Sequence, residues 1–466
     1  MAGRWPKMTN MHELPIMPGR LPVLGHALSY TKDPLSFFER AAMLGPFARV
    51  ELMGMKAVMV NDPAIIEAIC LTQNRQFKKD RFAQDLQRVL GTGLLTSDGD
   101  FWRRQRRLAQ PAFQRDRIAG YGQTMIDLTL AAIDRFCDGD VRDAHTDMMS
   151  LTLDIVGKAL FGADLGARAR EIGECLEHVA ARYSDPVAMG IPGWDKLPTP
   201  MNRRFQSAVA RLDHIMRDLL RSHRAGTTGD GKDLLSMLMA ARDDDGSGMS
   251  DDQLRDETIT LLLAGHETTA IALTFTWMLL SQHPSVRARL EAEVDEVFGD
   301  RTPTYADLPR LVFAERIVRE SMRLYPPAWS IGREAAEDVE LGGKRFKAGT
   351  WFWFIPWTMH RDARWFENPE RFDPDRWSGD LAKRLPKFAY FPFGGGPRQC
   401  IGSSFAMMET ILCLATMAHK LRLDVVPDYR LELVTAVTLR PKHGLGVRVS
   451  RRATVAPRSR ASPAPP

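Results

Sequence analysis

The sequence has few cysteines and almost no excess of charge of either sign. Only five cysteines occur among 466 residues, and none of them belongs to a CxxC pair. An odd number of scattered cysteines argues against a disulfide framework and favours a reducing cytoplasm. Lysine and arginine total 63 against 58 aspartate and glutamate residues, a net charge of +5. So small a surplus does not indicate a protein that binds nucleic acid.

The N-terminal segment lacks an apolar run long enough for a signal peptide or a membrane anchor. The longest apolar stretch, residues 258–280, carries His266 and Glu267 near its middle. A lipid-facing helix rarely holds an ionisable pair at that depth. We therefore expect a core helix in a cytoplasmic protein that has no membrane anchor.

No internal repeat is visible, and a single large enzyme domain is common at this chain length. We expect one domain over residues 14–450. Residues 1–13 are expected to form a flexible N-terminus. Residues 451–466 contain mainly Arg, Pro, Ala and Ser, a composition that predicts a disordered tail.

Helical patterns dominate the middle of the chain, from about residue 99 to residue 299. Ser250, followed by two aspartates, predicts the start of a long helix. That helix must end before Pro284, because proline disfavours helical backbone in the residue before it. Two further helices are predicted near 285–298 and 308–324.

Strand signals are confined to short segments on either side of this helical region. The β-prone runs 48–53 and 57–61, joined at Gly54, predict a hairpin. A second β-rich stretch spans residues 331–354. The sequence therefore predicts a mainly α fold with small β-sheets, in the α+β class.

The most specific signal is the segment 391–402, which reads FPFGGGPRQCIG. Three consecutive glycines let the backbone turn sharply and approach a flat group. Cys400 is predicted to begin a helix that runs to about residue 420, where free N–H groups and the helix dipole would favour a thiolate. A shielded thiolate with such donors suits a haem iron. An incidental buried cysteine in a glycine-rich loop is the disfavoured alternative, and the other four cysteines are expected to be inert core thiols.

This segment resembles the haem-binding signature of the cytochrome P-450 monooxygenases, FxxGxRxCxG. Every fixed position is matched, namely by Phe393, Gly396, Arg398, Cys400 and Gly402. The resemblance covers about residues 14–449. It implies a single-domain cytochrome P-450 fold with haem b between the long helix and the Cys loop, Cys400 as the axial ligand and O2 as co-substrate.

The centre of the long predicted helix reads AGHETT, from Ala264 to Thr269. Glycine inside a helix lowers helix stability by up to ~1 kcal/mol relative to alanine. Gly265 at this position is therefore expected to have a structural or functional role. The pattern is similar to the family's AGxxT oxygen-binding signature, formed here by Ala264, Gly265 and Thr268. The similarity implies that Thr268 hydrogen-bonds the oxygen or its water and that Glu267 joins a proton relay. His266 could line the pocket or pack in the core.

Glu320 and Arg323 are three residues apart and share one face of a predicted helix. Alone, such a pair is most often a surface salt bridge of little value. Similarity to the family's ExxR pair implies instead a buried network completed by a later arginine. Arg371 and Arg376 are both candidates, and the family's FxPxRF pattern favours Arg376, with Trp377 in place of the final phenylalanine.

Trp102 and Arg106 resemble the family's WxxxR motif and lie on one helix face. The resemblance implies that both donate to a haem propionate together with Arg333 and Arg398, while Phe393 packs against the ring. The neighbouring Arg103, Arg104 and Arg107 form a basic face. That face is either simply solvated or a docking patch for an acidic ferredoxin or flavodoxin.

The resemblance implies a largely apolar substrate pocket, lined by Val89, Leu94, Leu95, Leu263, Trp329, Ile331 and Val437. Such a lining indicates a ligand with little charge, and no basic residue presents itself as a carboxylate clamp. We expect a neutral terpenoid or polyketide-type metabolite to be hydroxylated or epoxidised. A fatty-acid hydroxylase is the alternative.

No GxGxxG or CxxxxCxxC spacing occurs, so the chain carries no recognisable reductase of its own. Two electrons are expected to come from NAD(P)H through a ferredoxin with its reductase, or a flavodoxin-type donor. A peroxide-driven haem-thiolate enzyme and a non-catalytic haem protein are less favoured, because neither needs the Glu267–Thr268 pair. We expect a monomer.

Overall fold

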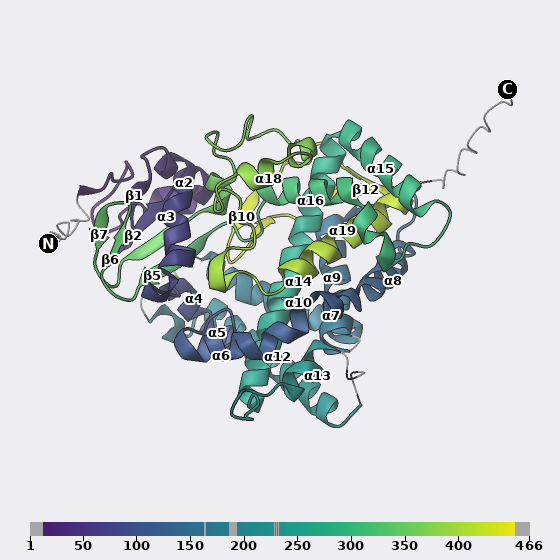
Figure 1. Cartoon of the computed structure of the whole chain (residues 1–466), viewed down its shortest axis with the longest axis horizontal. Helices are drawn as coiled ribbons and strands as arrows, with labels where there is room; N and C mark the ends of the chain where they lie inside the picture. Colours follow the sequence, from purple (N-terminus) through teal and green to yellow (C-terminus); the bar gives the residue numbers. More distant parts are fainter. Residues whose placement is uncertain are drawn as a thin grey trace.

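The computed structural model describes residues 13–162, 165–185, 193–227, 229, 231 and 233–452. The strands β1, β2, β5, β6 and β7 lie on one side of the molecule, β12 lies on the opposite side beside α15, and long helices fill the space between them (Figure 1). The described helices are α1 (Ala27–Lys32), α2 (Pro34–Ala42), α3 (Pro63–Glu67), α4 (Arg81–Asp85), α5 (Gln87–Leu90), α6 (Gly99–Ala109), α7 (Arg115–Ala119), α8 (Gly122–Ile133), α9 (Ala144–Phe161), α10 (Gly166–Ser184), α12 (Pro200–Arg224), α13 (Leu234–Ala240), α14 (Asp251–Gln282), α15 (Pro284–Phe298), α16 (Val312–Leu324), α17 (Pro356–Met359), α18 (Leu381–Arg384) and α19 (Ser403–Lys420).

The described strands form four small sheets. Their bounds are β1 (Phe47–Leu52), β2 (Met55–Val60), β3 (Phe77–Lys78), β4 (Val141–Asp143), β5 (Ile331–Ala335), β6 (Val339–Leu341), β7 (Lys344–Phe346), β8 (Trp351–Phe354), β9 (Leu421–Val425), β10 (Leu433–Thr435), β11 (Leu439–Pro441) and β12 (Gly446–Arg451). The largest sheet has the order β1-β2-β8-β5-β3. The predicted mainly α architecture with small sheets is confirmed.

The predicted hairpin is β1 and β2, which pair antiparallel on either side of the Met53–Gly54 turn. Both turn residues have positive φ, +48° at Met53 and +83° at Gly54, so the glycine occupies a position that favours it. Strand β2 then pairs in parallel with β8, whose residues come almost three hundred positions later in the chain. Segments almost three hundred residues apart are thus joined in one sheet.

Helix α14 crosses the centre of the molecule and begins and ends where the sequence predicts. Ser250 and Gln253 form a capping box at its start. It packs against α9, α12, α16 and α19. Its length and composition would allow it to cross a membrane, yet 72% of its most apolar window is buried inside the protein. It is the central core helix.

Two predicted helix starts differ from the structure. Helix α19 begins at Ser403 rather than Cys400, because the Cys400 N–H is bonded to the Phe393 carbonyl (3.0 Å), which keeps the cysteine in the loop. Helix α16 begins at Val312 rather than near residue 308, because a 3-10 turn that contains Pro309 precedes it. Proline within that turn cannot supply the N–H of a continuing α-helix.

The structure tests the predicted burial of the cysteines and part of the predicted C-terminal tail. Cys70, Cys175 and Cys413 are buried as expected, but Cys137 is exposed because it lies in the turn between α8 and β4. The expected flexible segment 1–13 and tail 451–466 lie almost wholly outside the described residues. Strand pairing nevertheless extends to Arg451, within the predicted tail.

Candidate active site

A cavity of about 1530 Å³ lies between α14 and the Cys loop, residues 391–402. Its wall includes Thr268 on α14 and Cys400 on the loop. Among the described cysteines only Cys400 faces this cavity. Cys413, one helix further on, is fully buried against the Thr129 hydroxyl (3.3 Å). Cys400 is therefore the one thiol placed to serve a group bound in the cavity.

The Cys loop is held in shape by close backbone packing. Gly396 has a φ of +67°, and a Cβ there would lie 2.0 Å from the Cys70 carbonyl oxygen. Only glycine fits that position. Burial raises the pKa of the Cys400 thiol, while the Gly402 N–H and the Arg106 guanidinium act in the opposite direction. The protein thus directs a backbone donor and a cation at the sulfur, as a thiolate ligand requires.

The middle of α14 forms the opposite wall of the cavity. Ala264, Gly265, Glu267 and Thr268 all line it. The Thr268 hydroxyl donates to the Ala264 carbonyl (2.7 Å), the bond to the preceding turn that bends helices. A Cβ on Gly265 would come within 3.3 Å of Val156 on α9, so glycine also allows the two helices to pack closely.

Glu267 is tied to the C-terminal part of the chain. Its Oε1 accepts from the Thr438 hydroxyl (2.8 Å) and lies 3.9 Å from Arg440 Nη1. His266 points the other way, toward α9, where its Nε2 contacts the Met149 carbonyl (3.0 Å). Burial lowers the pKa of His266 to about 4. His266 is a packed core residue and does not line the cavity.

Cationic side chains gather along one edge of the cavity. Arg398 donates to the Ser97 carbonyl (2.7 Å), pairs with Asp98, and lies 3.9 Å above the centre of the Trp102 ring. Arg106 donates to the Gln399 carbonyl (2.9 Å). Arg333 also lines this edge, and Phe393 lies on the adjoining wall. Arg398, predicted to bind a propionate, therefore has the Asp98 carboxylate as its partner in the structure.

Lys79 belongs to the same edge, although no sequence motif reveals it. It lines the cavity, and burial together with Arg333 and Arg398 lowers its pKa to about 7. Lys79, Arg333 and Arg398 lie close enough together to interact, and with an apolar wall and a single thiol they fit the shape and charge of haem b. That group has a flat apolar ring, two carboxylates on one edge and an iron that accepts a thiolate.

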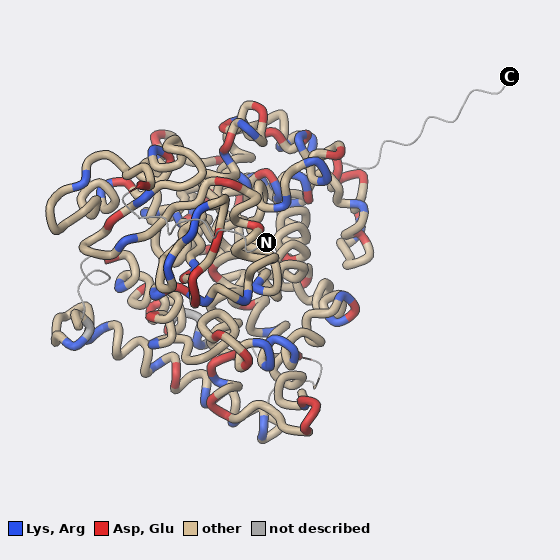
Figure 2. The backbone as a smooth tube through the Cα atoms, turned by 60° about the vertical axis from the view of Figure 1, so that its left-hand side comes forward, with Lys and Arg blue, Asp and Glu red and all other residues tan. Residues whose placement is uncertain are grey.

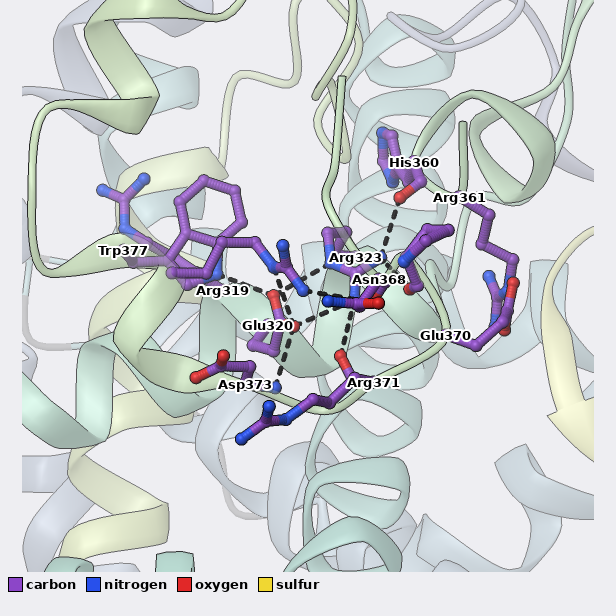
Figure 3. A network of polar contacts seen from close by, with 12 residues as sticks. Arg319, Glu320, Arg323, His360, Arg361, Asn368, Glu370, Arg371, Asp373 and Trp377 are labelled. Atoms are coloured by element: carbon purple, nitrogen blue, oxygen red, sulfur yellow. Dashed lines mark hydrogen bonds and ion pairs between the residues drawn. The ribbon is translucent and has the colours of Figure 1, made fainter. Parts of the chain in front are cut away.

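Beneath the cavity, a buried charge network joins α16 to the segment that follows α17 (Figure 3). Arg323 and Glu320 are both fully buried and form two bonds of 2.9 Å. Arg376, and not Arg371, brings its side chain to Glu320 (3.3 Å), while Arg371 contributes its carbonyl to Arg323 (3.1 Å). Trp377 donates its indole N–H to Glu320 (2.9 Å), a bond that phenylalanine could not make.

Six of the seven predicted pocket residues line the cavity, namely Leu94, Leu95, Leu263, Trp329, Ile331 and Val437. Val89 does not line it, so that prediction is wrong. Val89 is 1% exposed and lies in the core, because the short helix α5 turns this residue inward and presents Arg88 to the cavity.

The cavity wall also contains basic residues that the sequence did not reveal as candidates for binding a carboxylate. Arg88 and Arg182 both line it. Each faces Asp85, at 2.7 Å and 3.8 Å respectively, and Tyr183 donates to the Asp85 carbonyl (2.9 Å). A carboxylate between the two guanidinium groups offsets their charge, so this part of the wall is polar rather than strongly cationic.

The basic face of α6 is largely offset by acidic partners. Arg104 and Arg107 both bond Asp243, and Arg103 pairs with Asp100. Blue and red segments are interspersed over the tube, consistent with local pairing of charges (Figure 2). These contacts fit a solvated, paired face better than an open cationic patch.

Comparison with known proteins gives a consistent result. A family model described as Cytochrome P450 matches residues 15–445. Cyclooctatin synthase of Streptomyces melanosporofaciens is 38% identical over 430 residues, which cover 89% of this chain and 91% of that protein. Cyclooctat-9-en-7-ol 5-monooxygenase of the same organism is 36% identical, with 88% and 89% covered. Pentalenene oxygenase of Streptomyces avermitilis is 35% identical, with 93% and 97% covered.

Proposed function

The chain belongs to the cytochrome P450 family, and on that premise we propose that it is a monooxygenase that hydroxylates or epoxidises a neutral terpenoid. The observation that carries this proposal is the placement of Cys400 across one apolar cavity from Glu267 and Thr268. The relatives named above, which include a pentalenene oxygenase and a cyclooctat-9-en-7-ol 5-monooxygenase, support the terpenoid class.

Haem b would be held by the Cys400 thiolate and would supply the iron chemistry that activates O2. The cationic side chains Lys79, Arg333, Arg398 and Arg106 would hold the two propionates by charge and hydrogen bonds. Trp102 keeps Arg398 in position by stacking beneath its guanidinium (3.9 Å).

The polar residues of α14 manage protons in the cavity. The Thr268 hydroxyl donates its hydrogen bond to the Ala264 carbonyl (2.7 Å). Its oxygen can still accept a hydrogen bond from a water in the cavity. Glu267 borders the same space and is oriented by Thr438 (2.8 Å). The remaining apolar wall excludes bulk water and places the substrate.

Thr268→Ala tests this division of roles. Without the hydroxyl, protons reach the reduced oxygen less selectively, so O2 and NAD(P)H consumption should continue while product per O2 falls by roughly tenfold or more. The measurement is product formed against O2 and peroxide in one reaction. Thr276→Val, on the same helix and bonded to Ala272 (2.7 Å) away from the cavity, is the control. Full coupling in Thr268→Ala would require another proton path.

A ferredoxin with its reductase, or a flavodoxin, supplies the two electrons, and the enzyme works as a cytoplasmic monomer. Residues 14–450 act as the whole catalytic domain, with short segments at 1–13 and 451–466. The family model covers almost the same range, 15–445, which supports this domain assignment.

The substrate class is tested by titrating the ferric enzyme and following its Soret band. A shift toward the high-spin form reports that the added compound enters the cavity beside the iron. Neutral terpenoid hydrocarbons and alcohols should give saturable shifts, whereas medium- and long-chain fatty acids should not, because Asp85 occupies the space between Arg88 and Arg182. Saturation by fatty acids alone would replace the terpenoid assignment with fatty-acid hydroxylation.

A further inference from the structure

Several tryptophans line the cavity, and they differ in what their indole N–H groups bond. Three donate within the protein, namely Trp329 to the Ala436 carbonyl (3.1 Å), Trp351 to Asp80 (3.0 Å) and Trp357 to Glu39 (2.7 Å). Trp102 belongs to the haem edge. The indole N–H of Trp353, on β8, has no hydrogen-bond partner in the described part of the chain, and its nitrogen is not enclosed by protein.

Tyr30, on α1, lies beside Trp353 and also lines the cavity. The two ring planes are 23° from parallel, with their centroids 6.5 Å apart. Burial raises the pKa of the Tyr30 hydroxyl to about 12, so the O–H stays protonated at neutral pH. This hydroxyl likewise has no hydrogen-bond partner among the described residues. Because tyrosine and tryptophan usually bond their polar atoms when they are buried, this adjacent pair suits a ligand that carries a polar atom.

Neighbouring aromatic rings hold both side chains in place. Trp353 makes edge contacts with Trp351 (4.8 Å between centroids) and Phe38 (5.5 Å). Tyr30 makes edge contacts with Phe37 (5.9 Å) and Phe38 (6.0 Å). Such contacts favour one orientation of each ring, so the two polar groups form a preorganised surface to which a ligand can bind with little loss of side-chain freedom.

The chemistry of the pair selects for a neutral oxygen atom. An indole N–H only donates, whereas a phenol both donates and accepts. A hydroxyl or carbonyl oxygen can therefore accept from Trp353, and a hydroxyl can also donate to Tyr30. A hydrocarbon would leave both groups without a partner. In the adjoining wall, the carboxylates of Asp33 and Glu39 outnumber the ammonium group of Lys32, which disfavours an anionic ligand.

The pair is separate from the residues that serve the reaction itself. Neither α1 nor β8 carries a residue assigned above to haem or to proton transfer. Cys400 and Thr268 nevertheless border the same cavity as Tyr30 and Trp353. One molecule can therefore be held by its oxygen at the aromatic pair while another of its carbons reaches the space beside Cys400.

We propose that Tyr30 and Trp353 bind an oxygen atom that the substrate already carries, a neutral hydroxyl or carbonyl group, while another carbon of the same molecule is oxidised. The proposal rests on the monooxygenase function proposed above and narrows its substrate to an oxygenated terpenoid. The preceding reaction must then install that oxygen, either by an earlier monooxygenation or by addition of water to a terpenoid carbocation. The product leaves with a second oxygen function.

Equilibrium dialysis of the haem-loaded enzyme against matched terpenoids tests this site. The probes are β-farnesene with farnesol and cedrene with cedrol, pairs of a hydrocarbon and an alcohol on a similar carbon skeleton. Trp353→Phe and Tyr30→Phe keep the rings and remove the polar groups. Each should weaken binding of the alcohols by roughly three- to tenfold and leave the Kd of the hydrocarbons within about twofold.

Trp365→Phe is the matched control, because its indole N–H also lacks a partner among the described residues but does not border the cavity. It should leave the Kd of every probe unchanged. Equal binding of the alcohols by the wild type and by both cavity variants would overturn the role of Tyr30 and Trp353 and leave the monooxygenase function standing. Failure of every terpenoid to bind the wild type would overturn the terpenoid function itself, and this role with it.

A signal from Trp353 itself distinguishes direct contact from an indirect effect on packing. In protein labelled with 5-fluorotryptophan, the 19F resonance that is missing from Trp353→Phe belongs to Trp353. A bound alcohol should shift this resonance more than its hydrocarbon does, and Tyr30→Phe should reduce the difference. Equal shifts with bound alcohol and bound hydrocarbon would show that the substrate oxygen is held elsewhere.

Discussion

At the scale of single residues, the buried pair Glu320–Arg323 is the clearest determinant of folding. Both side chains are fully buried, so loss of one leaves the other charged in a low dielectric. Arg323→Met should therefore destabilise the fold by about 3–5 kcal/mol and give protein with little haem. Soret absorbance per protein and the urea midpoint measure both effects.

Arg319→Met provides the matched comparison. This neighbour on α16 pairs with Glu315 (2.7 Å) with 38% of its side chain exposed. A surface pair is worth less than about 1 kcal/mol, so haem content should remain normal. Normal haem content in Arg323→Met as well would contradict the structural role of the network.

Glu257, on α14, is a second buried acid, with a role in pH dependence. Burial raises its pKa to about 7, although its Oε2 accepts from the Leu94 N–H (3.1 Å). Between pH 4.5 and about 7, the folded state keeps a proton on Glu257 that the unfolded state releases. The stabilisation that comes from the protonated Glu257 carboxyl is therefore complete below pH 4.5. The effect is lost as the pH rises through about 7.

Glu257→Gln should therefore raise the free energy of unfolding at pH 8 by a few kcal/mol, with little gain at pH 5. Urea unfolding at the two pH values measures the difference. The exposed Glu296→Gln should show no such pH dependence. An equal effect of Glu257→Gln at both pH values would mean that the carboxyl does not titrate in this range.

At the scale of elements, local sequence signals define where most helices and strands lie. The Ser250 cap, the proline at position 284 and the Gly54 turn correctly predict α14 and the β1–β2 hairpin. Prediction from sequence fails where contacts between residues distant in the chain determine the structure. Val89 lies in a helix of four residues, which is too short for the sequence period to show which face is buried. Helix α19 begins later than predicted because the Cys400 N–H bonds to the Phe393 carbonyl.

The active-site motifs were predictable because each requires particular residue types at fixed spacing. Their partners from distant elements were not. Lys79, Thr438 and Arg440 reach the cavity or Glu267 only through tertiary packing, and nothing in their local sequence marks them. Arg398 shows the same limit, because its bond to Asp98 joins residues 300 positions apart.

Contact between the Cys loop and the π-helical turn Ala68–Thr72 can be tested at Gly396. A methyl group there would meet the Cys70 carbonyl carbon at 2.9 Å, closer still to its oxygen, in a region of positive φ. Gly396→Ala should displace the loop and prevent normal thiolate ligation. The reduced, CO-bound spectrum should then lose its strongly red-shifted Soret band.

Gly379→Ala controls for the substitution itself, since a Cβ there meets no atom within 4 Å and its φ is not positive. It should leave the CO-bound spectrum unchanged. A normal red-shifted band in Gly396→Ala would show that the loop can move away from Cys70 without disturbing the ligand.

At the scale of the whole molecule, buried histidines should make the protein less stable in acid. His145 on α9 and His266 on α14 lie at the interface of two extensively packed helices, and burial lowers the pKa of each to about 4. The unfolded chain binds protons at these positions below pH 6.5, whereas the folded chain does not. Stability is therefore full above pH 6.5 and is lost as the pH falls toward 4.

The urea midpoint should fall between pH 7 and pH 5, by the equivalent of roughly 2 kcal/mol for each imidazole. Replacing both with glutamine, His145→Gln and His266→Gln, should flatten this dependence, while the exposed His443→Gln should not. A slope that is unchanged in the double variant would assign acid unfolding to other groups. Since Glu257 acts in the opposite direction, stability should be greatest near neutral pH.

The parallel pairing of β2 with β8 also has a consequence for synthesis of the protein. Val58 pairs with Phe352, so the first hairpin has no neighbour on one edge until the ribosome has made most of the chain. Cys400 and Thr438 are translated later still. The pocket for the prosthetic group is therefore complete only after residues more than three hundred positions apart have all been made, so it can be filled only late in the synthesis of this domain.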